Sequence, residues 1–237
     1  MADLAETARA FAGAYPYMFA YVIGMPVYLA VLIAAHRSFV SILAAGLVLV
    51  PFAPLAVFHE TAYWSPRRIG GLPVGVEDAL YLFVSGSFAY ALAGLVHPFP
   101  QIRISGVTRA ARRVALITIA ALVVSIAFAL APFGGFMASC IIAGTAGVAG
   151  IALWPSRARA ALAAGAGSAL YHGSNLAGIL AINPDFASAF ASGARPAAIF
   201  MTEMLFQFLL AAAHVLYFAW VIEPRDKAAP SDLFAAR

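Results

Sequence analysis

Residues 199–222 read IFMTEMLFQFLLAAAHVLYFAWVI, a predominantly apolar run in which Glu203 is the one charged side chain. A transmembrane α-helix needs about 20 mostly apolar residues to cross the hydrocarbon core of a bilayer. The length and composition of this run therefore predict a helix that spans a membrane. Runs of the same kind recur along the chain, so this stretch decides how the rest is interpreted.

The composition of the whole chain favours a membrane protein. Of its 237 residues, 64% are hydrophobic and only 10% are charged, and the mean hydropathy is +0.92. A soluble globular domain carries roughly 25% charged residues, so this chain lacks the polar surface to cover itself in water. The formal charge of +4 comes without a basic stripe, which favours loop topology over nucleic-acid binding as its cause. The single cysteine, Cys140, lies in an apolar run and is expected to be a core residue.

The apolar runs predict an all-α, polytopic membrane bundle of about seven transmembrane helices, forming one domain over residues 1–237. Residues 2–12 carry mixed charge, which favours a short interfacial helix over a signal peptide. Residues 223–237 form a polar tail. Small residues pervade the fifth and sixth runs, where they let helix backbones approach closely in lipid. The predicted spans are 15–35, 38–59, 77–97, 113–131, 134–154, 160–182 and 199–222.

The basic residues are distributed unequally between the two sides of these predicted spans. Ten of the fourteen fall on the side that includes the C-terminus. Because cytoplasmic loops carry an excess of Lys and Arg, we expect the C-terminus in the cytoplasm and the N-terminus outside. A bacterial inner membrane is the expected location. The four basic residues on the outer side are Arg9, Arg67, Arg68 and Arg195.

Four acidic residues fall at the predicted outer ends of the spans. Glu60 closes the second span, Glu77 and Asp78 open the third, and Glu203 opens the seventh. Ionisable side chains in or near hydrocarbon are costly and usually mark function. A carboxylate in the first turn of a helix can also simply cap it. Their shared level predicts one catalytic chamber that uses several of them.

Polar side chains continue from two of these carboxylates at helical spacing. Gln207 and His214 follow Glu203 by four and eleven residues, and Tyr81 follows Glu77 by four. At 3.6 residues per turn, each set lies along one face of its helix. Polar faces of spanning helices turn toward the bundle interior rather than toward lipid.

The sixth span carries His172 and Asn175 on one face near its middle. A lone histidine is more often a hydrogen-bonded core residue, and a role in contacting substrate stays open beside that reading. The spacing of His, Cys, Asp and Glu suggests no metal site, and no glycine-rich loop suggests a nucleotide. We therefore expect neither a metal nor a cofactor.

The end of the second span and the start of the third carry a recognisable motif. The strings HETAYW at 59–64 and IGGLPVGVEDALYLF at 69–83 resemble the small membrane lycopene cyclases, which are heterodimeric in bacteria and fused in archaea and fungi. In that family an acidic residue ends one helix, a loop rich in Trp and Tyr follows, and a proline–acid motif opens the next helix. RPAAIFMTEMLFQF at 195–208 is a weaker match in the second half. Three positions depart from the family pattern. Gly75 and Met201 stand where the family has proline, and Met204 stands where it has a second acidic residue.

The resemblance implies two parallel three-helix repeats, over 15–97 and 134–222, joined by a linker helix at 113–131. It also implies a non-redox isomerase of carotenoid biosynthesis. In that reaction a carboxylic acid protonates the terminal double bond of a lipid-soluble isoprenoid, an internal alkene closes a ring, and a base removes a proton. Membrane lipid is the expected surrounding, nucleic acid is not an expected partner, and a homo-oligomer is compatible with the sequence. The expected catalytic residues are Glu77 and Glu203 with Asp78 and Glu60 in support, and the expected substrate contacts are Tyr63, Trp64, Tyr81, His172, Asn175, Gln207 and His214.

The sequence also bears on three other functions. A cyclase of the same fold acting on another prenyl chain, a quinone side chain or a meroterpenoid is favoured by the motif departures. A small-molecule transporter is disfavoured because no charged residue falls at mid-membrane depth. A seven-helix retinal protein needs a Schiff-base lysine in the seventh helix. The only lysine, Lys227, lies in the tail, which excludes that class.

Overall fold

The computed structural model describes residues 2–36, 39–57, 69–97, 107–129, 135–184, 186 and 196–222. Within these residues the chain is all-helical, without a strand, which confirms the predicted all-α class. Short 3₁₀ segments supplement the α-helices at Val50–Ala56 (η2), Ile69–Gly71 (η3) and Pro155–Arg157 (η5). The α-helices are α1 (Ala2–Ala14), α2 (Pro16–Ala34), α3 (Phe39–Leu49), α5 (Val76–Val96), α6 (Val107–Ala129), α7 (Gly135–Leu153), α8 (Ala158–Ile182) and α9 (Pro196–Ile222).

Two helices of the described part are by themselves long and apolar enough to cross a membrane, Val76–Val96 and Ala197–Ile222. Two bent pairs raise the number to four when each pair is taken as one span. These pairs are Glu6–Ala14 with Met18–Ala34, bent by 109°, and Ser139–Leu153 with Pro155–Ile182, bent by 114°. The chain therefore has the helices of a membrane protein, and each of the seven predicted spans overlaps one helix. The count of seven spans stays a prediction.

The second predicted span differs from the structure in its regularity. The α-helix α3 ends at Leu49 and continues as the 3₁₀ segment η2. Pro51 and Pro54 lie in this segment, and a proline inside an α-helix removes an amide donor and clashes with the preceding turn. The described part of the predicted span 38–59 is therefore helical throughout, with its second half in 3₁₀ geometry at these two prolines.

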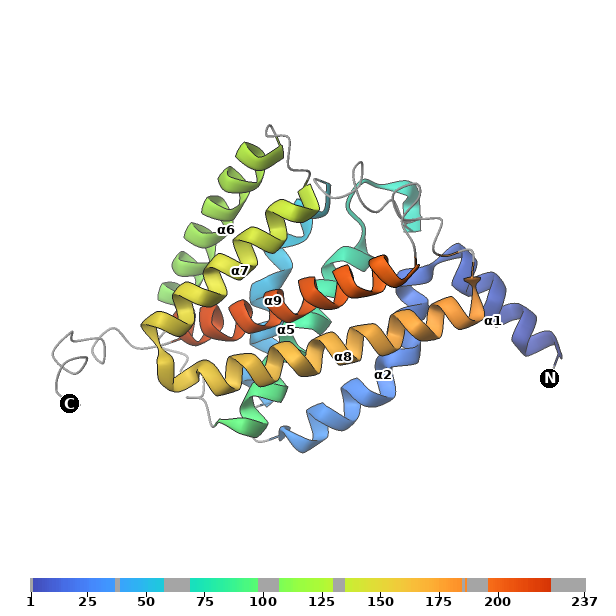
Figure 1. Cartoon of the computed structure of the whole chain (residues 1–237), viewed down its shortest axis with the longest axis horizontal. Helices are drawn as coiled ribbons and strands as arrows, with labels where there is room; N and C mark the ends of the chain where they lie inside the picture. The colour runs from blue at the N-terminus through green and yellow to red at the C-terminus, as the bar shows by residue number, and fades with distance from the viewer. Residues whose placement is uncertain are drawn as a thin grey trace, which may run out of the picture.

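The central helices run in both directions along the bundle (Figure 1). Gly165 of α8 lies beside Phe208 of α9, and Gly173, further along α8, lies beside Met204, which comes earlier in α9. These two helices are therefore antiparallel. In contrast, His214 lies beside Gly86 and Phe218 packs on Tyr90, so α5 and α9 run parallel. The N-terminal turns of α5 and α9 therefore lie at the same end of the bundle.

Glycines hold two of the helix pairs at close range. A methyl group added at Gly46 of α3 would lie 2.6 Å from the backbone oxygen of Phe83 in α5. A methyl group at Gly165 of α8 would lie 2.9 Å from the backbone oxygen of Phe208 in α9. Both distances are shorter than a van der Waals contact, so only glycine allows this approach. The prediction that small residues of the sixth span form a packing surface is confirmed.

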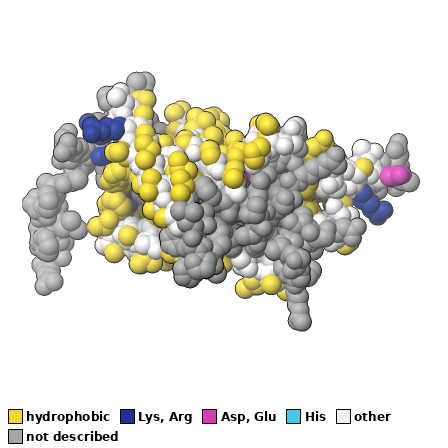
Figure 2. Space-filling model, turned by 90° about the horizontal axis from the view of Figure 1, so that it is seen from above, with side chains coloured by type: hydrophobic (Ala, Val, Ile, Leu, Met, Phe, Trp, Pro, Cys, Tyr) yellow, Lys and Arg dark blue, Asp and Glu magenta, His cyan; other side chains and the backbone are white. Residues whose placement is uncertain are grey.

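The basic residues of the described chain lie toward the ends of the bundle. Figure 2 shows apolar side chains over the middle of one face and Lys or Arg at both ends of the long axis. At the end opposite the starts of α5 and α9, Arg113 of α6 donates to the backbone oxygens of Trp220 and Val221. Its guanidinium also covers the Trp220 ring, with Cζ 4.7 Å from the centroid. Arg113 therefore ties α6 to the C-terminal end of α9, whose carbonyl groups attract a cation.

Candidate functional site

The start of α5 buries two carboxylates. Glu77 is 2% exposed and Asp78 is 5% exposed. The backbone N–H of Gly75 donates to Oδ2 of Asp78 at 2.8 Å, which is the contact of a residue that caps its own helix. The hydroxyl of Tyr21 in α2 approaches the backbone oxygen of Glu77 at 3.4 Å. Asp78 thus serves the helix terminus, whereas the Glu77 carboxylate lies in the interior of the bundle.

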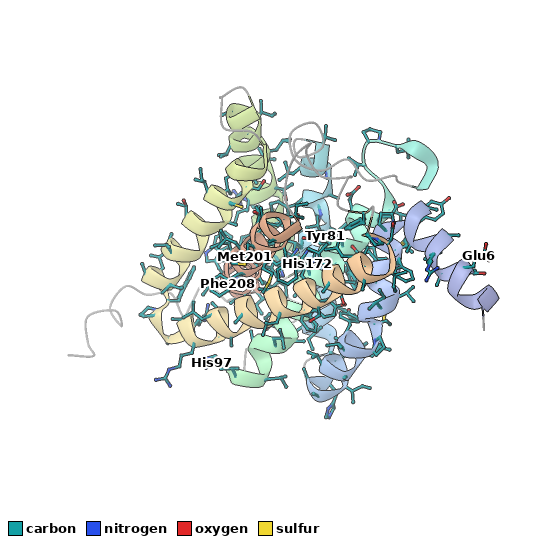
Figure 3. All side chains as sticks on the ribbon, turned by 45° about the vertical axis from the view of Figure 1, so that its right-hand side comes forward. Glu6, Tyr81, His97, His172, Met201 and Phe208 are labelled. Carbon is teal, nitrogen blue, oxygen red and sulfur yellow. The ribbon has the colours of Figure 1, made fainter. Side chains whose placement is uncertain are left out.

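The third carboxylate, Glu203, meets a histidine from the neighbouring helix. Its Oε2 lies 2.9 Å from Nε2 of His172 in α8, and the two side chains are 14% and 22% exposed. The ring of His172 packs edge-on against Tyr81 of α5, with 6.1 Å between centroids. Figure 3 shows Tyr81 and His172 together in the interior, well away from His97 and Glu6. Three helices therefore meet around one hydrogen-bonded acid–base pair.

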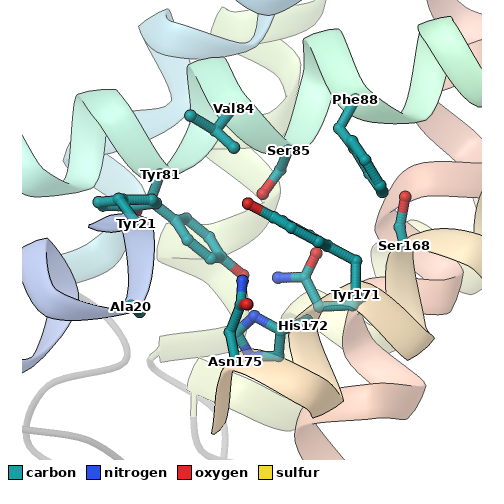
Figure 4. A pocket seen from close by; sticks show the side chains of 11 residues that line it. Ala20, Tyr21, Tyr81, Val84, Ser85, Phe88, Ser168, Tyr171, His172 and Asn175 are labelled. Atoms are coloured by element: carbon teal, nitrogen blue, oxygen red, sulfur yellow. The ribbon is translucent and has the colours of Figure 1, made fainter. Parts of the chain in front are cut away.

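A cavity of about 30 Å³ lies beside this pair, between α2, α5, α8 and α9 (Figure 4). A cavity needs about 10–15 Å³ of such space to hold one water molecule, so this one has room for a small polar group. Aromatic rings form much of its wall, and Phe88 lies with its centroid 4.3 Å from that of Tyr171. The side chains that line it are Tyr21, Tyr81, Phe88 and Tyr171 among the aromatic residues, Ser85, Ser168, His172, Asn175 and Gln207 among the polar ones, and Ala20 and Val84.

One wall of the cavity depends on a glycine of α2. A methyl group added at Gly24 would lie 2.4 Å from the hydroxyl of Tyr171 and 2.6 Å from Nδ2 of Asn175. The missing side chain leaves room for both polar ends, which Figure 4 shows pointing from α8 into the cavity. Gly24 therefore sets where Tyr171 and Asn175 can lie.

The predicted polar face of α9 divides between two environments. Glu203 and Gln207 belong to the site, and Gln207 is 2% exposed. His214 is equally buried but lies deeper, against Gly86 of α5 and stacked on Phe218. Within the described chain, His214 does not line the cavity, so its predicted contact with substrate is not supported by this geometry.

The sequence predicted some of the residues at this site but not others. Tyr81, His172, Asn175 and Gln207 all line the cavity. Tyr21 and Gly24 of α2 were not expected at the site, and their three-residue spacing on one helix face was the available signal. The remaining predicted residues lie outside the described residues: Glu60, Tyr63 and Trp64.

Among the described residues, no group of three or more His, Cys, Asp or Glu side chains could hold a metal ion. What the site offers is a carboxylate, an imidazole, aromatic faces and several neutral hydrogen-bonding groups. This set can hold a proton, deliver it to an apolar molecule and take it back. No family model, curated protein or solved structure matches this chain, so its function is inferred from the site itself.

Proposed function

We propose that this chain is an integral membrane enzyme that cyclises the end of an isoprenoid by proton transfer, without redox change. The observation that carries the proposal is the His172–Glu203 pair at 2.9 Å beside a cavity walled by aromatic rings. A carboxylic acid and an imidazole in hydrogen-bond contact provide a proton donor and a proton acceptor at the same place.

The reaction balances without a cofactor. The pair donates a proton to a terminal carbon–carbon double bond, which leaves a tertiary cation. An internal double bond attacks this cation and forms the ring bond. Loss of a proton from a neighbouring carbon back to the pair restores a double bond and the starting protonation state. Catalysis at Glu203 is supported by its contact with His172, and Glu77 is the second buried carboxylate at the same end of the bundle.

The aromatic side chains supply the second requirement of this chemistry. A cation over the face of an aromatic ring gains about 0.5–2 kcal/mol per ring. Tyr81, Phe88 and Tyr171 converge on the cavity from α5 and α8. The cavity is far smaller than an isoprenoid end, so such an end must displace some of these rings as it binds. Such side-chain rearrangement on binding is common.

The architecture proposed for this enzyme is a pair of repeats. The sequence LAAG occurs at 43–46 in α3 and again at 162–165 in α8, and each ends in the glycine that contacts a phenylalanine of the next spanning helix. In α5, residues 86–91 and 93 are buried and residue 92 is partly exposed. In α9, residues 211–216 and 218 are buried and residue 217 is partly exposed, which is the same pattern. These likenesses support two repeats joined by α6, within a bundle of about seven spans.

The register of the proposed repeats assigns the carboxylates differently from the sequence motif. Aligning Phe83 with Phe208 pairs Asp78 with Glu203, and it pairs Glu77 with Thr202. A register that paired Glu77 with Glu203 would differ from this one by one residue. In the proposed enzyme, Asp78 and Glu203 are therefore the positional counterparts, of which one caps a helix and the other pairs with His172.

The test is product formation in a host that accumulates open-chain isoprenoids. Extraction after expression of the chain should yield a compound of unchanged mass with one double bond fewer and one ring more. The absence of any cyclised product across fed carotenoid and shorter prenyl chains would contradict the proposal.

The proposed orientation places the C-terminus in the cytoplasm of a bacterium and the acidic site near the outer side. The arginines near the starts of α6 and α8 support it: Arg109, Arg112, Arg113, Arg157 and Arg159. A C-terminal fusion to alkaline phosphatase should be inactive and a C-terminal fluorescent protein should fold. Active phosphatase at the C-terminus would reverse the orientation.

A further inference from the structure

Two polar side chains that line the cavity carry buried atoms without a hydrogen-bond partner in the described chain. They are Nε2 of Gln207 on α9 and Oγ of Ser168 on α8. These residues are 2% and 3% exposed. Buried polar groups are almost always hydrogen-bonded, because a donor stripped of water and left unpaired is costly. The described residues around the cavity therefore supply no hydrogen-bond partner for Nε2 of Gln207 or Oγ of Ser168.

We propose that the cavity recognises an oxygen atom of the substrate, so that the enzyme acts on an isoprenoid carrying a hydroxyl or carbonyl group rather than on a pure hydrocarbon. This inference rests on the proposed function for the isoprenoid part and adds the class of substrate. The amide nitrogen of Gln207 can only donate, whereas the hydroxyl of Ser168 can donate or accept. A carbonyl oxygen accepts from both, and a hydroxyl accepts from Gln207 while donating to Ser168.

The size of the cavity agrees with such a group. A volume of about 30 Å³ fits one water-sized group, and a hydroxyl or carbonyl oxygen is of that size. The aromatic rings around it suit the apolar chain that carries the oxygen. A hydrocarbon end in the same place would leave both polar atoms buried and unpaired, and that penalty discriminates against it.

The two polar atoms also have a fixed relation to the acid–base pair. Ser168 precedes His172 by four residues on α8, and Gln207 follows Glu203 by four residues on α9. Since α8 and α9 are antiparallel, Ser168 lies deeper in the bundle than His172, and Gln207 lies deeper than Glu203. The oxygen site thus lies one helical turn, about 5.4 Å, from the proton donor. A substrate anchored there presents the double bond that lies a short distance along its chain from the oxygen.

The experiment compares two ligands of matched chain, farnesol and the hydrocarbon farnesene, on the full chain in detergent. Thermal stabilisation at increasing ligand concentration reports affinity without any turnover. The wild-type protein should bind farnesol at least about tenfold more tightly, the ratio that one lost hydrogen bond to a buried group produces. Equal affinity for the two ligands, or binding of neither, overturns the inference and leaves a buried water as the occupant.

Variants locate the effect at these two atoms. Gln207→Met removes the donor at similar volume, and Ser168→Ala removes the hydroxyl. Each should reduce the preference for farnesol, and the double variant should abolish it. A preference that survives in the double variant overturns the inference. Ser174→Ala is the matched control, because Ser174 is exposed on α8 and its hydroxyl bonds to the backbone oxygen of Leu170.

The experiments distinguish a failure of the proposed oxygen site from a failure of the proposed function. Glu203→Gln should lose cyclisation and keep the preference for farnesol, because Glu203 contributes no part of the oxygen site. A wild-type protein that prefers farnesol but cyclises no fed isoprenoid disproves the proposed function while the oxygen site stands. Cyclisation of hydrocarbons together with equal binding of both ligands leaves the function and removes the oxygen site.

Discussion

Nε2 of His172 lies 2.9 Å from Oε2 of Glu203, joining two helices through residues 31 positions apart in the chain. Both side chains are only partly exposed. The neighbouring Tyr81 closes one side of the histidine ring. The pair is therefore held in place from three helices, which is what an acid–base pair needs for reproducible proton transfer.

Removing either member of the pair should stop the reaction. Positioned general acids and bases contribute about 10²–10⁴-fold to rate, so Glu203→Gln and His172→Gln should each lower cyclised product by at least about 100-fold. Product per unit of folded protein is the measurement. Ser174→Ala, two residues along α8 from His172 and exposed, should retain full activity. Normal product from both pair variants would remove the pair from catalysis.

Gly24→Ala should lower enzyme activity while leaving the stability of the protein nearly unchanged. The added methyl group meets the hydroxyl of Tyr171 and the amide of Asn175, both at the free ends of side chains that can move aside. We expect the melting temperature to change little, while the displaced groups fill the cavity and cut product formation about tenfold or more, as for small misplacements near a site. Gly94→Ala is the control, because nothing lies within 4 Å of its added methyl group. Full activity of Gly24→Ala would show that the cavity is not used.

Gly46→Ala and Gly165→Ala should do the opposite and destabilise the bundle. The obstacle at each position is a backbone oxygen, at 2.6 Å from the added methyl group for Gly46 and 2.9 Å for Gly165, and a backbone cannot turn aside. Overpacking of this kind costs about 1–3 kcal/mol, with the larger loss expected for Gly46→Ala. Thermal unfolding in detergent measures it. Against the same baseline, Gly94→Ala should gain up to about 1 kcal/mol from helix propensity.

Arg113→Lys should loosen the contact between α6 and the end of α9. The lysine keeps the charge but loses the planar group that covers Trp220 while donating to two carbonyl oxygens. We expect a loss of about 1–2 kcal/mol in stability, read as a lower melting temperature. Arg112→Lys, at an exposed neighbouring position, should have no effect. Equal stability of the two variants would mean that Arg113 does not anchor α9.

The sequence predicted the helices well because length and hydropathy are local properties. The sixth predicted span, 160–182, nearly coincides with Ala158–Ile182. Hydropathy does not report the type of helix: Pro51 and Pro54 give the end of the second predicted span 3₁₀ geometry.

The site was only partly accessible from sequence. Helical spacing placed Gln207 on the same face as Glu203, and both reach the site. Spacing could not reveal that His172 pairs with Glu203, because pairing between helices depends on their register and rotation. That register is set by glycine contacts such as Gly165 with Phe208, and a single sequence does not specify which residue a glycine faces.

The glycines of α8 have a consequence for how the protein is made. Gly165 and Gly173 face α9, Gly167 faces Leu92 of α5, and Gly178 faces Ile23 of α2, so this helix offers small residues where an isolated segment would offer bulky apolar ones. On its own α8 does not meet the length-and-hydropathy criterion that α5 and α9 meet. In the proposed bundle of about seven spans, we therefore expect α8 to enter the bilayer only with partners translated before and after it, so that a ribosome stalled before α9 should leave α8 outside the lipid.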